Sequence, residues 1–358
     1  MTRWTRRGGI WISSSTRRCC MPGCRGCAAR STGYGRSACP GHARGRGSRC
    51  CFEALVLTFA TAMPMAKVAQ MTREHDTRIW RIVEHHVNAA RDQLDCSGVS
   101  RVGMDETSAR KGQDYISTFA DIDARRVVFA TEGRCATTVG RFAANLTKHG
   151  GDPDKVTDTS SDMSTAFISG ITTHLPNATM TFDRFHLAAK LSEAIDTVRR
   201  TEVATRPELK HTRWLWLKNH ATLTVKQQGE LHQLMRPSAQ LATARALRWR
   251  EDFQAFYDQD PSYAPEYLRR WCYGAKRSRP QPVKDFVALV EKHWDGIIAW
   301  HKNHLSNGLL EGINSLVQAA KARARGYRNK NKMITIVYLT AAKLQLQYPP
   351  SPTPHPHT

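Results

Sequence analysis

The chain has 358 residues, and its 53 Lys and Arg against 31 Asp and Glu give a formal net charge of +22. Such a surface attracts polyanions, which makes nucleic acid the leading partner class, with a basic but otherwise ordinary soluble protein as the alternative. The longest mainly apolar run, residues 54–66, is shorter than the roughly 20 residues that cross a bilayer. We therefore expect no membrane span, no signal peptide and a cytoplasmic, nucleoid-associated location.

Residues 1–52 form a segment rich in Cys and Arg. The first 51 residues hold eleven Arg, no Lys and no acid, together with seven of the ten cysteines. A C-x-x-C pair and later cysteines make a degenerate zinc ribbon one interpretation, with candidate ligands Cys24, Cys27, Cys39 and Cys50. The alternatives are a disordered basic arm or a wrongly assigned start, because few large apolar residues are available to fold this stretch.

Residues 53–95 have apolar residues at spacings of three and four, which predicts three short helices. A tight connection at 72–76 gives them the pattern of a helix-turn-helix. The third helix carries Arg78, Arg81 and His85 away from its apolar stripe, where they can meet a major groove. The alternative is a plain helical hairpin without a DNA-binding role.

Residues 99–347 alternate between strand and helix patterns. The expected order is strands at 101–104, 115–120 and 126–131, a helix at 137–149, a strand at 155–160, a helix at 164–174 and a strand at 178–182. This order predicts an α/β fold with an RNase H-like mixed sheet. Residues from about 190 to 304 read as a helical insertion whose tryptophans belong to its core. Helices at 306–325 and 333–346 follow, and the Pro-rich tail 348–358 is expected to be disordered.

Three carboxylates are the candidate catalytic residues. Asp105 is placed at the end of the first strand, Asp162 after the fourth, and Glu311 on the late helix. The first and fourth strands of an RNase H-like sheet are neighbours, so the two aspartates should converge, and a helix across the sheet can add the glutamate. Such oxygen ligands suit Mg²⁺, and a pair of ions can support in-line phosphoryl displacement.

The late helix also predicts supporting groups. Counting by three and four places Glu311, Asn314, Gln318, Lys321 and Arg325 on one face, a strip suited to a DNA backbone, with Arg328 beyond it as a further DNA contact. Asp183 and His186 form a D-x-x-H cluster after the fifth strand. This pair can support the metal site or bind a phosphate, or it can be a structural hydrogen-bonding pair.

The same residues resemble the ISL-three family of insertion-sequence transposases. The similar blocks are Val102-Gly103-Met104-Asp105-Glu106, then Ser161-Asp162-Met163-Ser164 with Phe182-Asp183-Arg184-Phe185-His186, and finally Ser306-Asn307-Gly308-Leu309-Leu310-Glu311. The resemblance covers about residues 53–346 and implies a DDE recombinase. Such an enzyme binds the terminal inverted repeats of its element, cuts there with Mg²⁺ and joins the ends to target DNA as a homo-oligomer.

Two points stay open at this stage. The second carboxylate is Asp162 by strand order, whereas Asp183 lies in the more distinctive block; we assign Asp162 as ligand and Asp183 as close support. The function also has two alternatives: a catalytically decayed or domesticated transposase that acts as a DNA-binding repressor, and another RNase H-like nuclease acting on hybrids or junctions. Mg²⁺-dependent nicking of terminal-repeat DNA separates the transposase from the repressor, and a preference for terminal-repeat DNA over hybrids and four-way junctions separates it from the nuclease.

Overall fold

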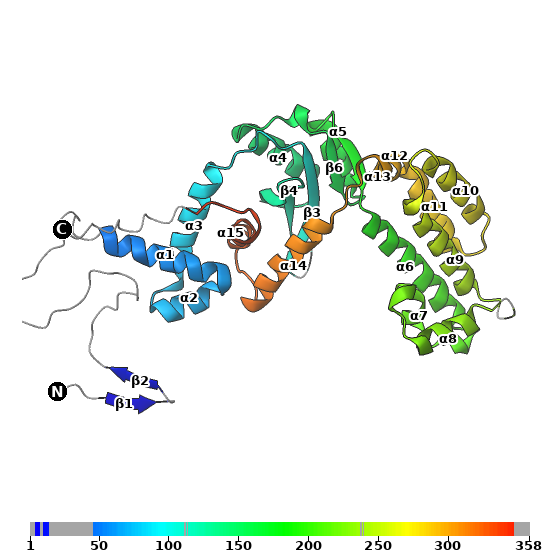
Figure 1. Ribbon diagram of the computed structural model, residues 1–358, viewed down its shortest axis with the longest axis horizontal. Coiled ribbons are helices and arrows are strands. Elements are labelled where there is room, and N and C mark those ends of the chain that lie inside the picture. The colour runs from blue at the N-terminus through cyan, green and yellow to red at the C-terminus, as the bar shows by residue number, and fades with distance from the viewer. Residues whose placement is uncertain are drawn as a thin grey trace, which may run out of the picture. The chain divides into compact units, whose positions relative to one another are not determined.

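The structure is a computed structural model that describes residues 4–7, 10–13, 46–110, 112, 114–236, 238 and 240–346, with side chains from residue 51 onward (Figure 1). The chain divides into two compact units, Met1–Ser48 and Arg49–Thr358. The zinc candidates Cys24, Cys27 and Cys39, the side chain of Cys50 and the tail 348–358 lie outside the described residues. No helix of the described part is both long and apolar enough to cross a bilayer.

The described part of the first unit contains a short hairpin that the sequence analysis did not anticipate. Strand β1 (Trp4–Arg7) pairs antiparallel with β2 (Ile10–Ser13), and Trp4 lies opposite Ser13. Gly8 and Gly9 separate the strands, and such a pair readily adopts the positive φ angles of a two-residue hairpin turn. A Gly-Gly dipeptide between segments with β-branched and aromatic residues was the sequence signal that could have predicted this hairpin.

Three helices come next along the chain: α1 (Arg46–Ala62), whose first residues belong to the first unit, and then α2 (Met65–Thr72) and α3 (Asp76–Asp92) in the second. The α1 helix begins before residue 53, so it crosses the boundary expected at 52/53. Arg73 ends α2 in the left-handed conformation with φ 57°, and His75 caps α3 by accepting from the Thr77 amide. The buried face of α3, which includes Ile79, Val83 and Val87, follows the predicted apolar stripe.

A five-stranded mixed sheet forms the centre of the second unit, in the order β5-β4-β3-β6-β7. The antiparallel strands are β3 (Arg101–Arg110), β4 (Asp114–Asp121) and β5 (Arg126–Glu132). Strand β6 (Asp158–Ser161) pairs parallel with β3, and β7 (Thr179–Phe182) pairs parallel with β6. This order fits the RNase H-like fold, with the first and fourth strands as neighbours. The expected strand at 155–160 begins later, because Pro153–Lys155 forms a 3₁₀ turn capped by Asp152.

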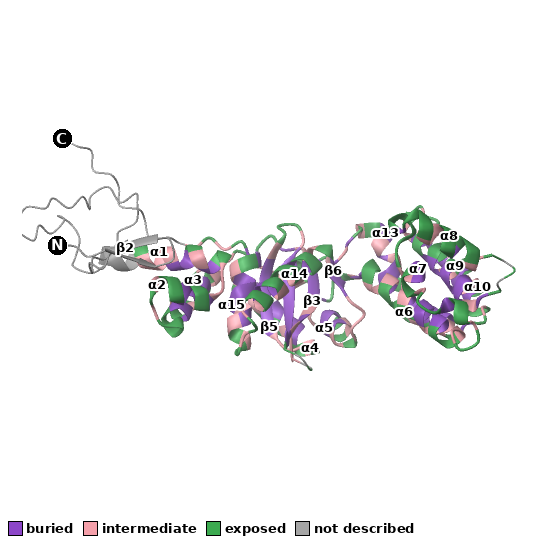
Figure 2. Ribbon diagram, turned by 90° about the horizontal axis from the view of Figure 1, so that it is seen from below, coloured by how far each residue is buried: buried purple, intermediate pink, exposed green. Residues whose placement is uncertain are grey.

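Helices cover both faces of this sheet (Figures 1 and 2). On one face, α4 (Ala136–Lys148) and α5 (Thr165–His174) enclose a core with Phe119, Phe142 and Phe167. On the other face, α14 (Gly308–Arg323) and α15 (Lys330–Ala341) pack with the first three helices. The buried hydroxyl of Tyr338 on α15 accepts from the amide of Ala130 on β5, at 3.0 Å.

Between β7 and α14 the chain is helical, as predicted for the insertion. Its α-helices are α6 (Arg184–Glu202), α7 (Arg213–Leu217), α8 (Val225–Leu234), α9 (Ala242–Gln254), α10 (Ala264–Lys276), α11 (Gln281–Lys292), α12 (Trp294–Ile298) and α13 (Trp300–Asn303). The insertion has its own core, which buries Trp216 and Trp271 as expected, whereas Trp214 is 58% exposed.

The insertion core also includes Phe182, the last residue of β7. Gly296 on α12 lies against this ring so closely that a Cβ at residue 296 would stand 2.4 Å from the Phe182 Cε2 atom. The residue after Phe182 is Asp183. The packing of the insertion therefore reaches the strand end that holds one of the candidate site residues.

Candidate functional site

Asp105 lies in the middle of β3, not at its end as the sequence analysis expected. The strand continues to Arg110 because it stays paired with β4, whereas its pairing with β6 covers only residues 101–103. The Asp105 carboxylate accepts from the Glu106 amide at 2.8 Å and from Asn314 Nδ2 at 2.7 Å. It therefore stands just beyond the end of the parallel pairing, on the edge that β6 leaves open.

Burial raises the pKa of Asp105 to about 6. The Glu106 amide and His186 lower this pKa, whereas the negative charges of Asp162 and Asp183 raise it further. Such a combination of desolvation and neighbouring like charges is common at functional sites. The structure therefore brings Asp105, Asp162, Asp183 and His186 within electrostatic range of one another.

Asp162 directly follows β6 and precedes α5. It is partly buried, and one of its oxygens accepts from the Ser164 amide at 3.0 Å. Its charge acts on Glu106 as well as on Asp105: burial first, and Asp162 second, raise the pKa of Glu106 to about 7, while Arg134 lowers it. We assigned no role to Glu106 from sequence, although its place beside Asp105 was the available signal.

Asp183 precedes α6 and is fully buried. Its Oδ1 atom accepts from the Asn307 amide at 3.4 Å, while its Oδ2 atom lies 3.8 Å from His186 Nδ1. Neither Asp183 Oδ2 nor His186 Nδ1 has a hydrogen-bond partner among the described residues. A buried carboxylate oxygen without a donor is energetically costly and is suited to a cation.

Asn307, which the sequence analysis did not single out, connects two parts of the site. It is 1% exposed, its amide faces Asp183, and its side chain donates to the Met104 carbonyl at 3.2 Å. It therefore joins the beginning of α14 to both β3 and the end of β7. The signal in the sequence was its position in the Ser306-Asn307-Gly308 block.

Five polar residues form a row along one face of α14 and just beyond it: Glu311, Asn314, Gln318, Lys321 and Arg325. The middle three of them contact β3. Asn314 contacts Asp105 as described above. Gln318 Nε2 donates to Thr107 Oγ1 at 2.8 Å and to the Ser108 carbonyl at 3.0 Å, and Lys321 Nζ donates to the same carbonyl at 2.7 Å. These three groups are thus engaged by the protein itself, in place of the DNA strip inferred from sequence.

Glu311 and Arg325, the two ends of this row, are exposed. Among the described residues, no side chain hydrogen-bonds or pairs with the Glu311 carboxylate, and no group of three or more His, Cys, Asp or Glu side chains is arranged to hold a metal ion. The structure therefore gathers the aspartates and His186 but does not add Glu311 to them. Glu311 lies one helical turn before Asn314, on the same face of α14.

The expected DNA-contacting residues of α3 are on its exposed side. Arg81 and His85 are exposed, and so is Arg78, which donates to Glu74 at 2.6 Å and lies 5.2 Å from the centre of the Phe52 ring. Beyond α14, Arg325 has φ 56° before Gly326, and the Arg328 carbonyl accepts from the Arg110 guanidinium. The α3 and α14 groups are on separate elements.

A family model described as a transposase, of the ISL-three DDE type, matches residues 102–337. The chain belongs to the ISL-three family of insertion-sequence transposases. The match begins at β3 and ends within α15, so this family region contains the whole sheet, the helical insertion and α14.

Two relatives of the chain are also transposases of insertion sequences. The chain is 30% identical over 238 residues to the transposase for insertion sequence element IS1001 of Bordetella parapertussis, which covers 64% of this chain. It is 25% identical over 269 residues to the transposase for element IS1557 of Mycobacterium tuberculosis, covering 67% of this chain. Both matches span 58% of the length of the relative.

Proposed function

We propose that this chain cuts and rejoins DNA at the terminal inverted repeats of its own insertion sequence, through Mg²⁺-dependent phosphoryl transfer. The observation that carries the proposal is the grouping of the partly buried Asp105 with Asp162 and Asp183 at neighbouring strands of the sheet. Carboxylates held together in a low-dielectric site repel one another, and a divalent cation relieves that repulsion. Membership of a transposase family supports the same reaction class.

The donor chemistry suits a hard divalent cation, which prefers carboxylate oxygens; because the described side chains form no ready-made metal cluster, ligation would require the carboxylates to approach one another. Asp105, Asp162 and Asp183 supply carboxylate oxygens, and the Oδ2 atom of Asp183 is buried without a donor. We assign Asp105 and Asp162 as ligands, with Asp183 and His186 in support and Glu311 as the third carboxylate. Bound Mg²⁺, as a pair of ions, would activate the attacking oxygen and stabilise the leaving oxygen.

The chain's own residues orient this site. Asn314 holds one oxygen of Asp105 and thereby fixes α14 against β3, which keeps Glu311 one turn away on the same helix face. Lys321 and Gln318 extend that attachment along β3. In this scheme Asn314 and Lys321 are positioning residues, and the Glu311 carboxylate stays accessible for ligation.

DNA recognition is proposed for the helices α1 to α3, acting as a helix-turn-helix. Arg78, Arg81 and His85 are exposed on α3, as a recognition surface requires. Arg325 and Arg328 are also exposed, beyond the end of α14, and would contact phosphates of the bound DNA there. Pairing of two element ends implies a homo-oligomer on DNA.

The test uses purified protein and a labelled duplex that contains the terminal repeat, identified from the DNA flanking the gene. We expect nicking with Mg²⁺ that is abolished in Asp105→Ala, Asp162→Asn and Glu311→Ala, while binding to the duplex is retained. Glu230→Ala, an exposed acid on α8, is the matched control and should cleave normally. Duplex binding without nicking by the wild-type protein would instead support the repressor.

The second carboxylate is tested separately by Mn²⁺ binding, followed by electron paramagnetic resonance. If Asp162 is a ligand and Asp183 a support, Asp162→Asn should weaken Mn²⁺ binding more than Asp183→Asn. The reverse order would transfer the ligand role to Asp183. Loss of binding only in Asp105→Asn would exclude both as ligands.

A further inference from the structure

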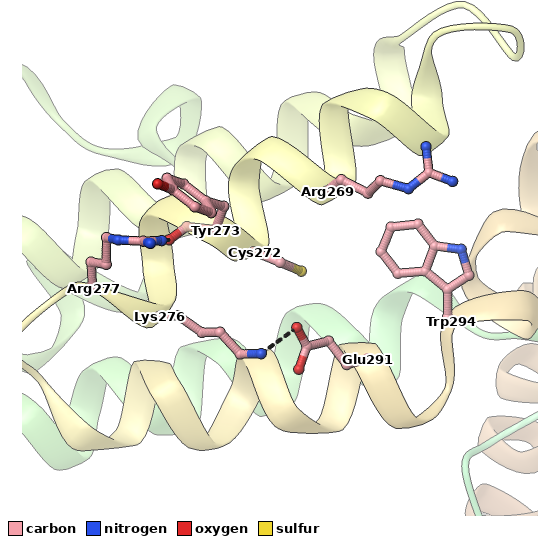
Figure 3. Close-up of a pocket in the computed structure, with 7 residues that line it drawn as sticks. All are labelled: Arg269, Cys272, Tyr273, Lys276, Arg277, Glu291 and Trp294. Atoms are coloured by element: carbon pink, nitrogen blue, oxygen red, sulfur yellow. Dashed lines mark hydrogen bonds and ion pairs between the residues drawn. The ribbon is translucent and has the colours of Figure 1, made fainter.

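A hollow of about 380 Å³ lies in the helical insertion, between α10 and α11 and beside the first residue of α12 (Figure 3). Arg269, Cys272, Tyr273 and Lys276 border it from one face of α10, at steps of three, one and three. Arg277 follows at the end of α10, Glu291 comes from α11, and Trp294 begins α12. Its volume is within the range of small-molecule sites, about 300–1,000 Å³.

The charge of this hollow is positive. Three cations face one acid, and Lys276 Nζ pairs with Glu291 at 2.7 Å, which leaves the two arginines. Arg269 lies 3.8 Å from Glu266, but both side chains are more than half exposed, so this pair is weak. Arg277 donates only to the Tyr273 carbonyl in the described structure. Two guanidinium groups therefore remain available for an anion.

Each of these two arginines lies over an aromatic ring. The Arg277 guanidinium lies 3.4 Å from the centre of the Tyr273 ring, and that of Arg269 lies 5.9 Å from the centre of the Trp294 ring. Tyr273 is 64% exposed, so its ring is accessible to a ligand. Stacked cations and rings of this kind offer flat surfaces together with phosphate-binding groups.

The floor of the hollow is small and uncharged. Figure 3 shows the Cys272 thiol directed into the space between Arg269, Trp294 and the Lys276–Glu291 pair. Burial raises the pKa of Cys272 to about 12, so the group remains a neutral thiol. A neutral floor between charged walls suits a ligand with an apolar face and an anionic end.

We propose that this hollow binds an unstacked stretch of single-stranded DNA, with a base against Trp294 or Tyr273 and separate backbone phosphates on Arg269 and Arg277, which stand at opposite ends of it (Figure 3). The inference rests on the proposed function, which makes DNA the substrate and exposes single strands during cleavage. A paired duplex hides the base faces, and a free phosphate makes no use of the rings. The rings and arginines together therefore favour an open strand over either.

The experiment measures the affinity of the full chain for a fluorescein-labelled single-stranded 12-mer and for the same sequence as a duplex, by anisotropy. We expect Trp294→Ala and the double variant Arg269→Gln/Arg277→Gln to weaken single-strand binding about tenfold, the effect of losing one stacked base or two phosphate contacts. Duplex binding should change less than twofold. Trp294→Phe should recover most of the single-strand affinity.

One matched control comes from α10 itself and the other from α7, outside the hollow. Arg270→Gln, next to Arg269 but directed to the Tyr263 hydroxyl, and Trp214→Ala, an exposed tryptophan outside the hollow, should bind single strands normally. Deoxyadenosine monophosphate should compete with the 12-mer, and inorganic phosphate alone should not.

The inference is overturned if both variants keep the single-strand affinity of the wild type, or if phosphate competes as strongly as the nucleotide. If the protein still nicks the duplex in that case, the proposed function is unaffected. A protein that binds neither form of DNA contradicts the proposed function itself. Circular dichroism with a urea midpoint identifies unfolded variants, and Trp294→Phe then provides the decisive comparison.

Discussion

Asn314→Ala tests the contact that joins α14 to the candidate site. The 2.7 Å hydrogen bond from Asn314 Nδ2 to Asp105 is charge-assisted when the carboxylate is ionised and joins residues 209 positions apart. Losing a hydrogen bond to a charged, partly buried group costs about 1.5–3 kcal/mol. We expect that loss in the free energy of unfolding at pH 8, measured by urea denaturation with EDTA present.

The pH dependence gives this prediction its sign. Burial raises the folded-state pKa of Asp105 to about 6, above the ordinary value of 3.8, so Asp105 contributes stability at low pH that is lost as pH rises through 6. Asn314 lessens that loss by stabilising the ionised form. The difference between wild type and Asn314→Ala should therefore be larger at pH 8 than at pH 5.

Ser315→Ala provides the control, because Ser315 is exposed on the same helix. Its effect should be within about 0.5 kcal/mol of zero. If Asn314→Ala behaves like this control at pH 8, or if its effect is the same at both pH values, the ionised contact does not stabilise the fold and the reasoning is refuted.

Two further predictions concern the helical insertion. Trp216 is fully buried and its indole N–H donates to Thr212 Oγ1 at 3.0 Å, so Trp216→Ala should lower the free energy of urea unfolding by about 3–5 kcal/mol, whereas the exposed Trp214→Ala should change it by about 0.5 kcal/mol or less. Burial, and then the charge of His304, lower the pKa of His301 below its ordinary value of 6.5. The neutral imidazole therefore stabilises the fold above pH 6.5, and this stability is lost as the pH falls through the lowered folded-state pKa. His301→Phe should consequently flatten the decline in unfolding free energy between pH 7 and pH 5, and an unchanged slope would contradict this assignment.

Much of the sheet could be predicted from sequence because its apolar strands and amphipathic helices have different periods. The order of strands and helices from residue 101 to 182 agrees with the structure, and this order places Asp105 beside Asp162. The second half of β3 was not predicted. Its residues Glu106, Thr107 and Ser108 are polar, and they are accommodated by β4 and by side chains of α14.

The candidate site was less predictable than the sheet. Spacing places Asn314 and Lys321 on one helix face but cannot tell whether that face contacts solvent or β3, because the answer depends on packing between segments about 200 residues apart. The same limit applies to Glu311, which shares their face yet is exposed. Glu106 was missed because it stands beside the more conspicuous Asp105, and Asn307 because a single amide between small residues has no pattern of its own.

The attachment of α14 to β3 has a consequence for solubility. Since β6 pairs with β3 only over residues 101–103, the following residues present backbone groups on that side, and Gln318 and Lys321 donate to the Ser108 carbonyl there. An uncovered strand edge is a template for pairing with another chain. The late helix thus covers this edge, and a fragment that stops before residue 308 would expose both the edge and the apolar sheet face that α14 and α15 bury.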